Sequence, residues 1–179
     1  MAQTSLADAL ARADLIHDTP VLDAAITRVA GELDTALAGE HAVFLTVMHG
    51  GMLFAAKLAL AMRTDMEFDY VHATRYRGAT SGAELHWMRQ PAATLAGRTV
   101  VLADDILDEG HTLKAIRDFC RDRGARRVLL AVLCRKVHGR CAEGIAADAC
   151  GVEVPDRYVF GYGMDYHEQG RNLPAIYAI

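Results

Sequence analysis

The chain has no excess of basic residues and no long apolar run. Its 179 residues include 19 Lys and Arg against 23 Asp and Glu, a net charge of −4, so nucleic acid is not expected as a main partner. The first ten residues lack the basic and apolar segments of a secretion signal, and no stretch is long enough to cross a bilayer. We therefore expect a cytoplasmic protein without a membrane partner.

Cysteine is scarce and has no metal-binding spacing. None of the four cysteines forms a CxxC pair, so we expect reduced thiols rather than disulfides. His138 and Cys141 could supply only half of a zinc site, because no second half follows at metal spacing. The sequence has no repeat or low-complexity tract, and its 52% hydrophobic content predicts one globular domain over residues 1–179.

Apolar runs and helical patterns alternate along the chain, which predicts an α/β fold with a parallel β-sheet core flanked by helices. The expected helices cover 19–39, 51–62 and 112–122, and the expected strands cover 42–48, 68–74, 99–104 and 128–134. Thr19 is the expected N-cap of the first helix, with Pro20 at its first position. We expect the core at about 40–137 and a small hood over the carboxyl edge of the sheet, from about 1–20 plus 140–179.

The strand at 99–104 runs directly into three acids and a glycine turn. From Val100 to Thr112 the sequence is VVLADDILDEGHT. Asp104, Asp105 and Asp108 would repel one another unless a cation or a polyhydroxyl ligand lies among them, which indicates a Mg²⁺-bound substrate. Gly110 permits a tight turn, after which backbone amides at the start of a helix can hold a phosphate.

This segment resembles the phosphoribosyl pyrophosphate motif of type I phosphoribosyltransferases. The tail from Val154 to Tyr166, VPDRYVFGYGMDY, followed by Arg171, resembles the purine-binding segment of the family's 6-oxopurine branch. The resemblance spans roughly residues 15–173. It implies Mg²⁺ as cofactor and transfer of 5-phosphoribose from phosphoribosyl pyrophosphate to hypoxanthine, with guanine as second choice, giving a purine nucleoside monophosphate and pyrophosphate. It also implies a homodimer or homotetramer.

The resemblance implies a role for each part of the acidic segment. Asp104 and Asp105 would lie beside the ribose hydroxyls and the metal, and Asp108 would exchange a proton with the purine. The 5′-phosphate would rest on the backbone amides of Asp108, Glu109, Gly110, His111 and Thr112. The family usually has a small hydroxyl residue where this chain has Glu109, so we expect the Glu109 carboxylate to point outward.

Residues His49, Gly50 and Gly51 match the family's pyrophosphate loop. The branch commonly has lysine where this chain has His49, so the loop's charge should depend on pH. The family often has a non-proline cis peptide here, which would fall between Met48 and His49. Arg171 would also meet the pyrophosphate.

The resemblance also implies a purine site and a lid. Lys136 would donate to the exocyclic oxygen at C6, with neighbouring Arg135 leaving a one-residue ambiguity. Tyr158 would stack on the purine, the Val159 carbonyl would accept from its edge, and Asp165 would be a second metal-side ligand or a water-bridged partner. Residues 75–89 are expected to form a long loop or irregular hairpin, with Arg75 and Tyr76 where the branch usually has Ser-Tyr in its lid.

Three alternatives remain open at this stage. One is a non-catalytic regulator of the same fold that senses phosphoribosyl pyrophosphate or binds RNA, although Asp108, Lys136 and Asp165 are retained and the net charge is acidic. The others are an enzyme for a different nitrogenous base and an enzyme that prefers xanthine.

Overall fold

A six-stranded sheet forms the centre of the computed structural model, which describes residues 5–75 and 85–179. The strand order is β4-β3-β2-β5-β6-β7, and all neighbours are parallel except β3 and β4. The expected parallel α/β sheet is therefore confirmed. The bounds are β2 Ala42–Met48, β3 Met66–Arg75, β4 Leu85–Arg89, β5 Thr99–Leu107, β6 Arg127–Lys136 and β7 Ala149–Val154.

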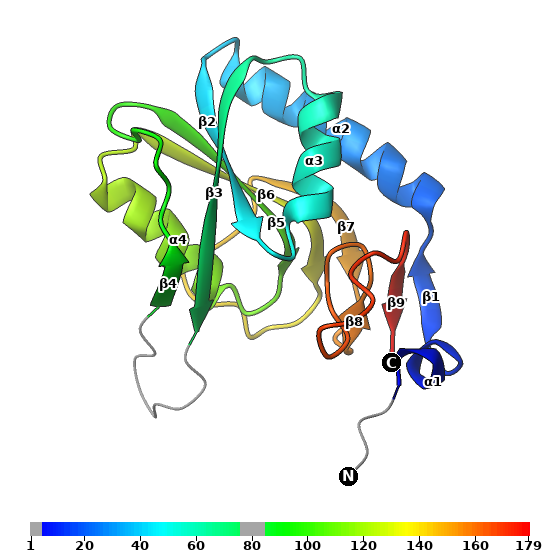
Figure 1. Cartoon of the computed structure of the whole chain (residues 1–179). Helices are drawn as coiled ribbons and strands as arrows, with labels where there is room; N and C mark the ends of the chain where they lie inside the picture. Colours follow the sequence, from blue (N-terminus) through cyan, green and yellow to red (C-terminus); the bar gives the residue numbers. More distant parts are fainter. Residues whose placement is uncertain (1–4, 76–84) are drawn as a thin grey trace.

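Helices cover both faces of this sheet (Figure 1). Helices α2 (Thr19–Leu37) and α3 (Met52–Ala61) pack on one face, and α4 (His111–Asp122) packs on the other. Successive residues of β2 alternate between the two cores: Phe44 packs with α2 and α3, whereas Val43 and Leu45 pack with α4. Because both faces are buried, the strands are continuous apolar runs in the sequence.

Helix α2 begins one residue earlier than expected, at Thr19 instead of Pro20. The cap is Asp18, whose Oδ1 accepts from the Val21 amide at 3.1 Å. Thr19 is the first helical residue, and its hydroxyl instead donates to the Pro174 carbonyl at 2.7 Å. The prediction of Thr19 as the cap was therefore wrong, because a tertiary contact takes its hydroxyl while Asp18 is free to cap.

A second, three-stranded sheet joins the two ends of the chain. Its order is β1-β9-β8, and it lies beside the central sheet with helix α1 (Figure 1). The bounds are α1 Leu6–Leu10, β1 Asp14–His17, β8 Val159–Phe160 and β9 Ile176–Ala178. These residues come from the segments expected to form the hood.

The central sheet extends further along the chain than expected. Strand β7 pairs in parallel with β6 and is the edge strand of the core, whereas the expected core ended near residue 137. Residues of β7 alternate between buried and partly exposed positions. An edge strand therefore lacks the continuous apolar run that marks the central strands.

Strands β3 and β4 are antiparallel arms of a hairpin at the other edge. Arg75, the last residue of β3, pairs with Leu85, which fits the expected irregular hairpin. Tyr76 and the rest of the expected lid up to residue 84 lie outside the described residues. Within the described part of the chain, no helix combines the length and the apolar character needed to span a membrane.

Candidate active site

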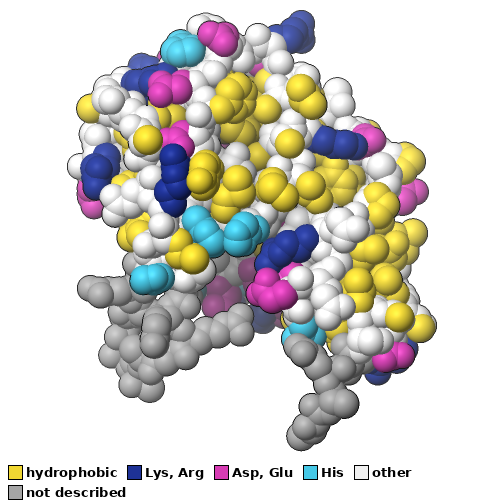
Figure 2. Space-filling model, viewed as in Figure 1, with side chains coloured by type: hydrophobic (Ala, Val, Ile, Leu, Met, Phe, Trp, Pro, Cys, Tyr) yellow, Lys and Arg dark blue, Asp and Glu magenta, His cyan; other side chains and the backbone are white. Residues whose placement is uncertain are grey.

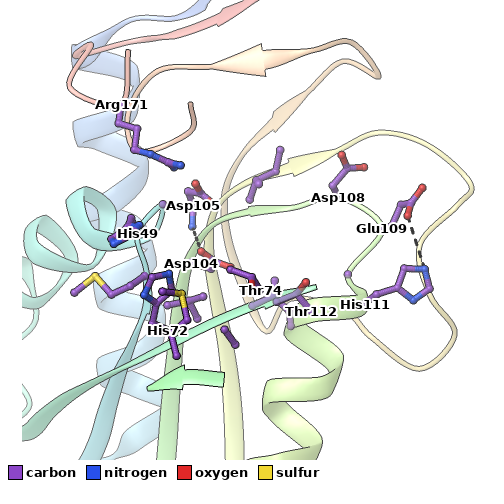
Figure 3. A pocket seen from close by; sticks show the side chains of 18 of the residues that line it. His49, His72, Thr74, Asp104, Asp105, Asp108, Glu109, His111, Thr112 and Arg171 are labelled. Carbon is purple, nitrogen blue, oxygen red and sulfur yellow. Dashed lines mark hydrogen bonds and ion pairs between the residues drawn. The ribbon is translucent and has the colours of Figure 1, made fainter. Parts of the chain in front are cut away.

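A cleft of about 690 Å³ lies where β2, β3 and β5 end and α4 begins. Figure 2 shows it as a hollow with histidine side chains along one edge and acidic side chains within. Figure 3 shows the acids of β5 facing into it between Arg171 and the start of α4. The expected site residues that line this one cleft are His49, Gly50, Asp104, Asp105, Asp108, Glu109, Gly110, His111, Thr112 and Arg171.

Three chain segments meet at Gly50 with no room for a side chain. A Cβ at Gly50 would lie 1.9 Å from Asp105 Oδ2, and one at Gly51 would lie 2.7 Å from the Val47 carbonyl oxygen. From the hood, a Cβ at Gly163 would lie 2.1 Å from the Gly50 carbonyl oxygen. These glycines therefore bring the loop backbone against the acids of β5.

Asp104 and Asp105 form a crowded acidic pair at the end of β5. The Asp105 amide donates to Asp104 Oδ1 at 2.9 Å, and Asp105 is only 8% exposed. Burial and the neighbouring charge of Asp105 raise the pKa of Asp104 well above its usual range. Burial also raises the pKa of Asp105, against the effect of nearby donors and of Arg171. Two carboxylates in this state fit a site that receives a cation or sugar hydroxyls.

The turn into α4 lines the cleft with residues 108–112. Gly110 has φ 77°, and an added Cβ would lie 2.8 Å from Ile145 Cγ2. Among the described residues, no side chain caps the helix that follows. Glu109 is half-exposed, with its carboxylate 3.8 Å from His111 Nε2 (Figure 3). The Glu109 carboxylate thus pairs at the rim, and the amides of the turn remain able to bind an anion.

Asp108 is held by two donors, one at the end of β6 and one just after it. Lys136 Nζ donates to Asp108 Oδ2 at 2.6 Å, and His138 Nε2 lies 2.6 Å from Asp108 Oδ1. Burial alone would raise the pKa of Asp108, but the hydrogen bonds from Lys136 and His138 lower it. Of the two neighbouring candidates, Lys136 faces Asp108, whereas the Arg135 guanidinium pairs with Glu153.

Sequence reasoning missed His138 as a site residue. The sequence suggested only that His138 could supply half of a zinc site. In the structure its side chain is 3% exposed and contacts Asp108. The available signal was its spacing of two from Lys136, because residues i and i+2 of an extended chain point to the same side.

Asp165 and Arg171 pair at the hood side of the cleft. Arg171 Nη2 lies 2.8 Å from Asp165 Oδ1, and the Glu168 amide donates to Asp165 Oδ2 at 2.9 Å. Tyr158 is half-exposed, and its hydroxyl donates to the Asp165 carbonyl at 3.1 Å. Val159 is buried in β8. Both carboxylate oxygens of Asp165 are thus engaged, and the described residues contain no group of three acids, histidines or cysteines arranged around a metal position.

His72 lines the cleft and is a second residue that the sequence did not reveal. Its ring packs on that of His49, with centroids 4.3 Å apart (Figure 3). Burial, together with the charge of His49, lowers the pKa of His72. The peptide between Met48 and His49 is cis, as the resemblance implied.

The comparisons with known proteins agree with this geometry. The phosphoribosyl transferase domain model matches residues 12–168. The chain belongs to the phosphoribosyltransferase family. A hypoxanthine-guanine phosphoribosyltransferase of Streptococcus pneumoniae is 33% identical over 163 residues, which cover 90% of this chain and 89% of that protein.

Solved phosphoribosyltransferases have the same fold. A hypoxanthine phosphoribosyltransferase of Staphylococcus aureus matches with a TM-score of 0.87 and 26% identity, covering 93% of this chain and 90% of that one. A hypoxanthine-guanine phosphoribosyltransferase of Bacillus anthracis matches with a TM-score of 0.84 and 25% identity, covering 93% and 97%. The phosphoribosyltransferase model ends at residue 168, so Arg171 enters the site from the geometry and the tail motif rather than from that match.

Proposed function

We propose that this phosphoribosyltransferase acts in purine salvage, transferring 5-phosphoribose from phosphoribosyl pyrophosphate to hypoxanthine and to guanine, with pyrophosphate as the second product. The observation that carries the proposal is one cleft that joins an acidic pair to the start of α4, which no side chain of the described residues caps, with Asp108 shared between this cleft and the adjoining cavity that Lys136 lines. The S. pneumoniae relative, named for both bases, supports the substrate class.

The acidic end of the cleft would receive the sugar and the leaving group. Asp104 and Asp105 would accept hydrogen bonds from the ribose hydroxyls, while the amides from Asp108 to Thr112 would hold the 5′-phosphate. The close-packed loop at Gly50 and Gly51 would offer its amides to the pyrophosphate, with Arg171 as a cationic donor.

Mg²⁺ is the proposed cofactor because the acidic pair suits a hard cation. When bound, Mg²⁺ neutralises part of the pyrophosphate's developing charge. Asp104 and Asp105 would hold it directly or through water. Each oxygen of Asp165 already has a partner, Arg171 on Oδ1 and the Glu168 amide on Oδ2, so we propose a water-bridged role for it.

The purine would lie between the hood and the Asp108–Lys136 pair. Tyr158 would stack on the ring, and the Val159 carbonyl would accept from its edge. Lys136 would donate to the exocyclic oxygen at C6, while Asp108 would take the proton that the attacking ring system releases. An ionised Asp108 suits this role, since the base must be unprotonated when the purine binds.

The activity test measures nucleotide formed from phosphoribosyl pyrophosphate and Mg²⁺ with hypoxanthine, guanine, xanthine, adenine or uracil in separate reactions. We expect inosine and guanosine monophosphates and little product from adenine or uracil. Binding of phosphoribosyl pyrophosphate without product from any base would instead support a regulator of the same fold.

Xanthine is the second candidate for the preferred base. One solved structure with a TM-score of 0.83 and 26% identity is named hypoxanthine-guanine-xanthine phosphoribosyltransferase. A turnover on xanthine that exceeds the turnover on hypoxanthine in the same assay would favour this candidate.

A further inference from the structure

We propose that His138 is a positioning residue that holds Asp108 as an oriented carboxylate toward the purine. The inference rests on the proposed function for its effect on turnover. Its structural basis is a buried imidazole whose two ring nitrogens both have defined partners.

The partners of the ring assign its tautomer. The Arg140 backbone amide donates to His138 Nδ1 at 3.0 Å, so Nδ1 has a lone pair and no proton. In the neutral ring the proton is then on Nε2, which lies 2.6 Å from Asp108 Oδ1 and donates to it. The backbone at Arg140 thus turns His138 into a fixed hydrogen-bond donor.

The segment that carries His138 is itself anchored. Arg140 forms two side-chain hydrogen bonds with Asp156, at 2.8 and 2.7 Å. This pair ties the turn after β6 to the turn after β7, so the Arg140 amide stays in place under His138. A preorganised donor costs little reorganisation when substrate arrives.

Lys136 and His138 each contact a different oxygen of the Asp108 carboxylate. Lys136 takes Oδ2 and His138 takes Oδ1, and each oxygen retains a second acceptor position that can face the purine. When Lys136 turns toward the purine oxygen, His138 still fixes the carboxylate plane. His138 therefore keeps Asp108 oriented while Lys136 also donates to the purine.

The charged groups around Asp108 come from three segments. Lys136 ends β6 and is followed by His138 and Arg140, Glu109 and His111 lie at the start of α4, and Asp156 follows β7. Lys136 and His138 both contact Asp108, and neither has a second acidic ion-pair partner among the described residues. Because Lys136 is also proposed to donate to the purine, only the loss of His138 would alter Asp108 without removing a purine contact. Its removal should therefore change the basicity of Asp108 most selectively.

The test compares His138→Leu, which fills the space without a donor, with His138→Gln, whose amide can donate from the same distance. His138→Ala is a second variant without a donor. His41→Leu is the matched control, because His41 is an exposed histidine at the amino end of β2. Thermal unfolding checks that each variant is folded.

The direct readout is a carbon NMR titration of the Asp108 carboxyl, assigned by its loss in Asp108→Asn. We expect the leucine and alanine variants to raise the Asp108 pKa by at least about one unit, since a hydrogen bond to a charged group is worth that much. The glutamine variant should keep it within about half a unit of the original. An unchanged Asp108 pKa in both donorless variants would overturn the proposal.

The kinetic readout is the pH profile of kcat/KM for hypoxanthine. Because the unprotonated carboxylate is the active form, a raised Asp108 pKa should move the acid limb of the profile to higher pH. Turnover should fall roughly 10- to 100-fold in His138→Leu and recover in His138→Gln. A wild-type protein without activity would refute the proposed function but leave the NMR test intact, whereas an active protein with an unmoved acid limb would refute the role of His138.

Discussion

Asp108 and the pair Asp104–Asp105 come from the same strand end, separated only by Ile106 and Leu107, yet their environments are opposite. Burial and mutual charge raise the pKa of Asp104, whereas donors from Lys136 and His138 lower the pKa of Asp108. Asp104 and Asp105 lie within β5, whereas Asp108 lies in the turn after it and meets Lys136 and His138. The difference shows that residues far away in the sequence decide what an acid in this motif can do.

The first way to break this comparison is Asp108→Asn. The amide cannot accept from both Lys136 and His138, and it cannot take a proton from the purine. We expect turnover on hypoxanthine to fall by roughly 10²- to 10⁴-fold, with KM for phosphoribosyl pyrophosphate nearly unchanged. Steady-state kinetics measure both values.

Asp118→Asn is the matched control for that variant. Asp118 on α4 also has a lowered pKa, because hydrogen bonds from Lys114 and Arg117 outweigh the effect of burial. It does not line the cleft, so its turnover should match the wild type. Equal losses in the two variants would mean that Asp108 acts only through fold stability.

Asp104→Asn tests the other side of the comparison. The amide oxygen can still accept from the Asp105 backbone, but one of the two crowded charges is gone. Affinity for Mg²⁺ and phosphoribosyl pyrophosphate should fall by roughly tenfold or more, while the free protein should gain about 1 kcal/mol of unfolding free energy. Urea denaturation of the metal-free protein measures the stability.

The pH dependence of that gain has a defined sign. A carboxyl group whose pKa is raised on folding contributes stability in its protonated form and loses it as pH rises through the window between its ordinary and raised pKa. The gain from Asp104→Asn should therefore grow with pH in this window. A gain that grows as pH falls would contradict the assignment of a raised pKa.

His72→Leu tests the histidine pair beside the acidic pair. Burial and His49 lower the pKa of His72, so binding of anionic pyrophosphate should be accompanied by proton uptake. We expect wild-type affinity to be roughly 3- to 10-fold higher at about pH 6 than at about pH 8, and the variant to show less of this change. The affinities of the wild type and the variant are measured by calorimetry in the same buffers, so that protonation of the ligand itself contributes equally to both. An equal pH dependence in the two proteins would exclude His72 as the group that takes up the proton.

Asp34→Ala is expected to have the smallest effect on activity. It tests an acid that, like Asp108, is held by hydrogen bonds but lies outside the cleft. Asp34 on α2 accepts from the amides of Arg63 and Thr64 and from the Thr64 hydroxyl, which lower its pKa against the effect of burial. Its loss should cost about 1–2 kcal/mol of stability without changing KM. In the wild type this contribution disappears as pH falls through the lowered pKa, which an acid denaturation curve can follow.

The sheet and its ligand edge could be predicted because buried parallel strands are continuous apolar runs, such as Ala42–Met48. The role of β7 could not, because an edge strand is only partly buried and its apolar residues are interrupted. Thr19 was misassigned as a cap because its hydroxyl bonds to Pro174, more than 150 residues away in the sequence.

The residues of the site also fall into those that the sequence could predict and those that it could not. Asp104, Asp105, Gly110 and Thr112 lie in one short segment of the sequence, so a local motif was enough to predict that they share one cleft. His72 was missed because its relevance comes from the pairing of β2 with β3, which a single sequence does not contain as a local signal. His138 was missed although its spacing of two from Lys136 was such a signal, because the approach of β6 to β5 gives that spacing its meaning.

Asp104 and Asp105 are proposed to bind phosphoribosyl pyrophosphate with its metal, whereas Asp108, three residues later, is proposed to act on the purine. The most direct test is calorimetric binding of phosphoribosyl pyrophosphate with Mg²⁺, without any purine, to the wild type, Asp104→Asn and Asp108→Asn. The account predicts that affinity falls by roughly tenfold or more in Asp104→Asn and stays within about threefold in Asp108→Asn. Equal losses in both variants, or a loss only in Asp108→Asn, would contradict it.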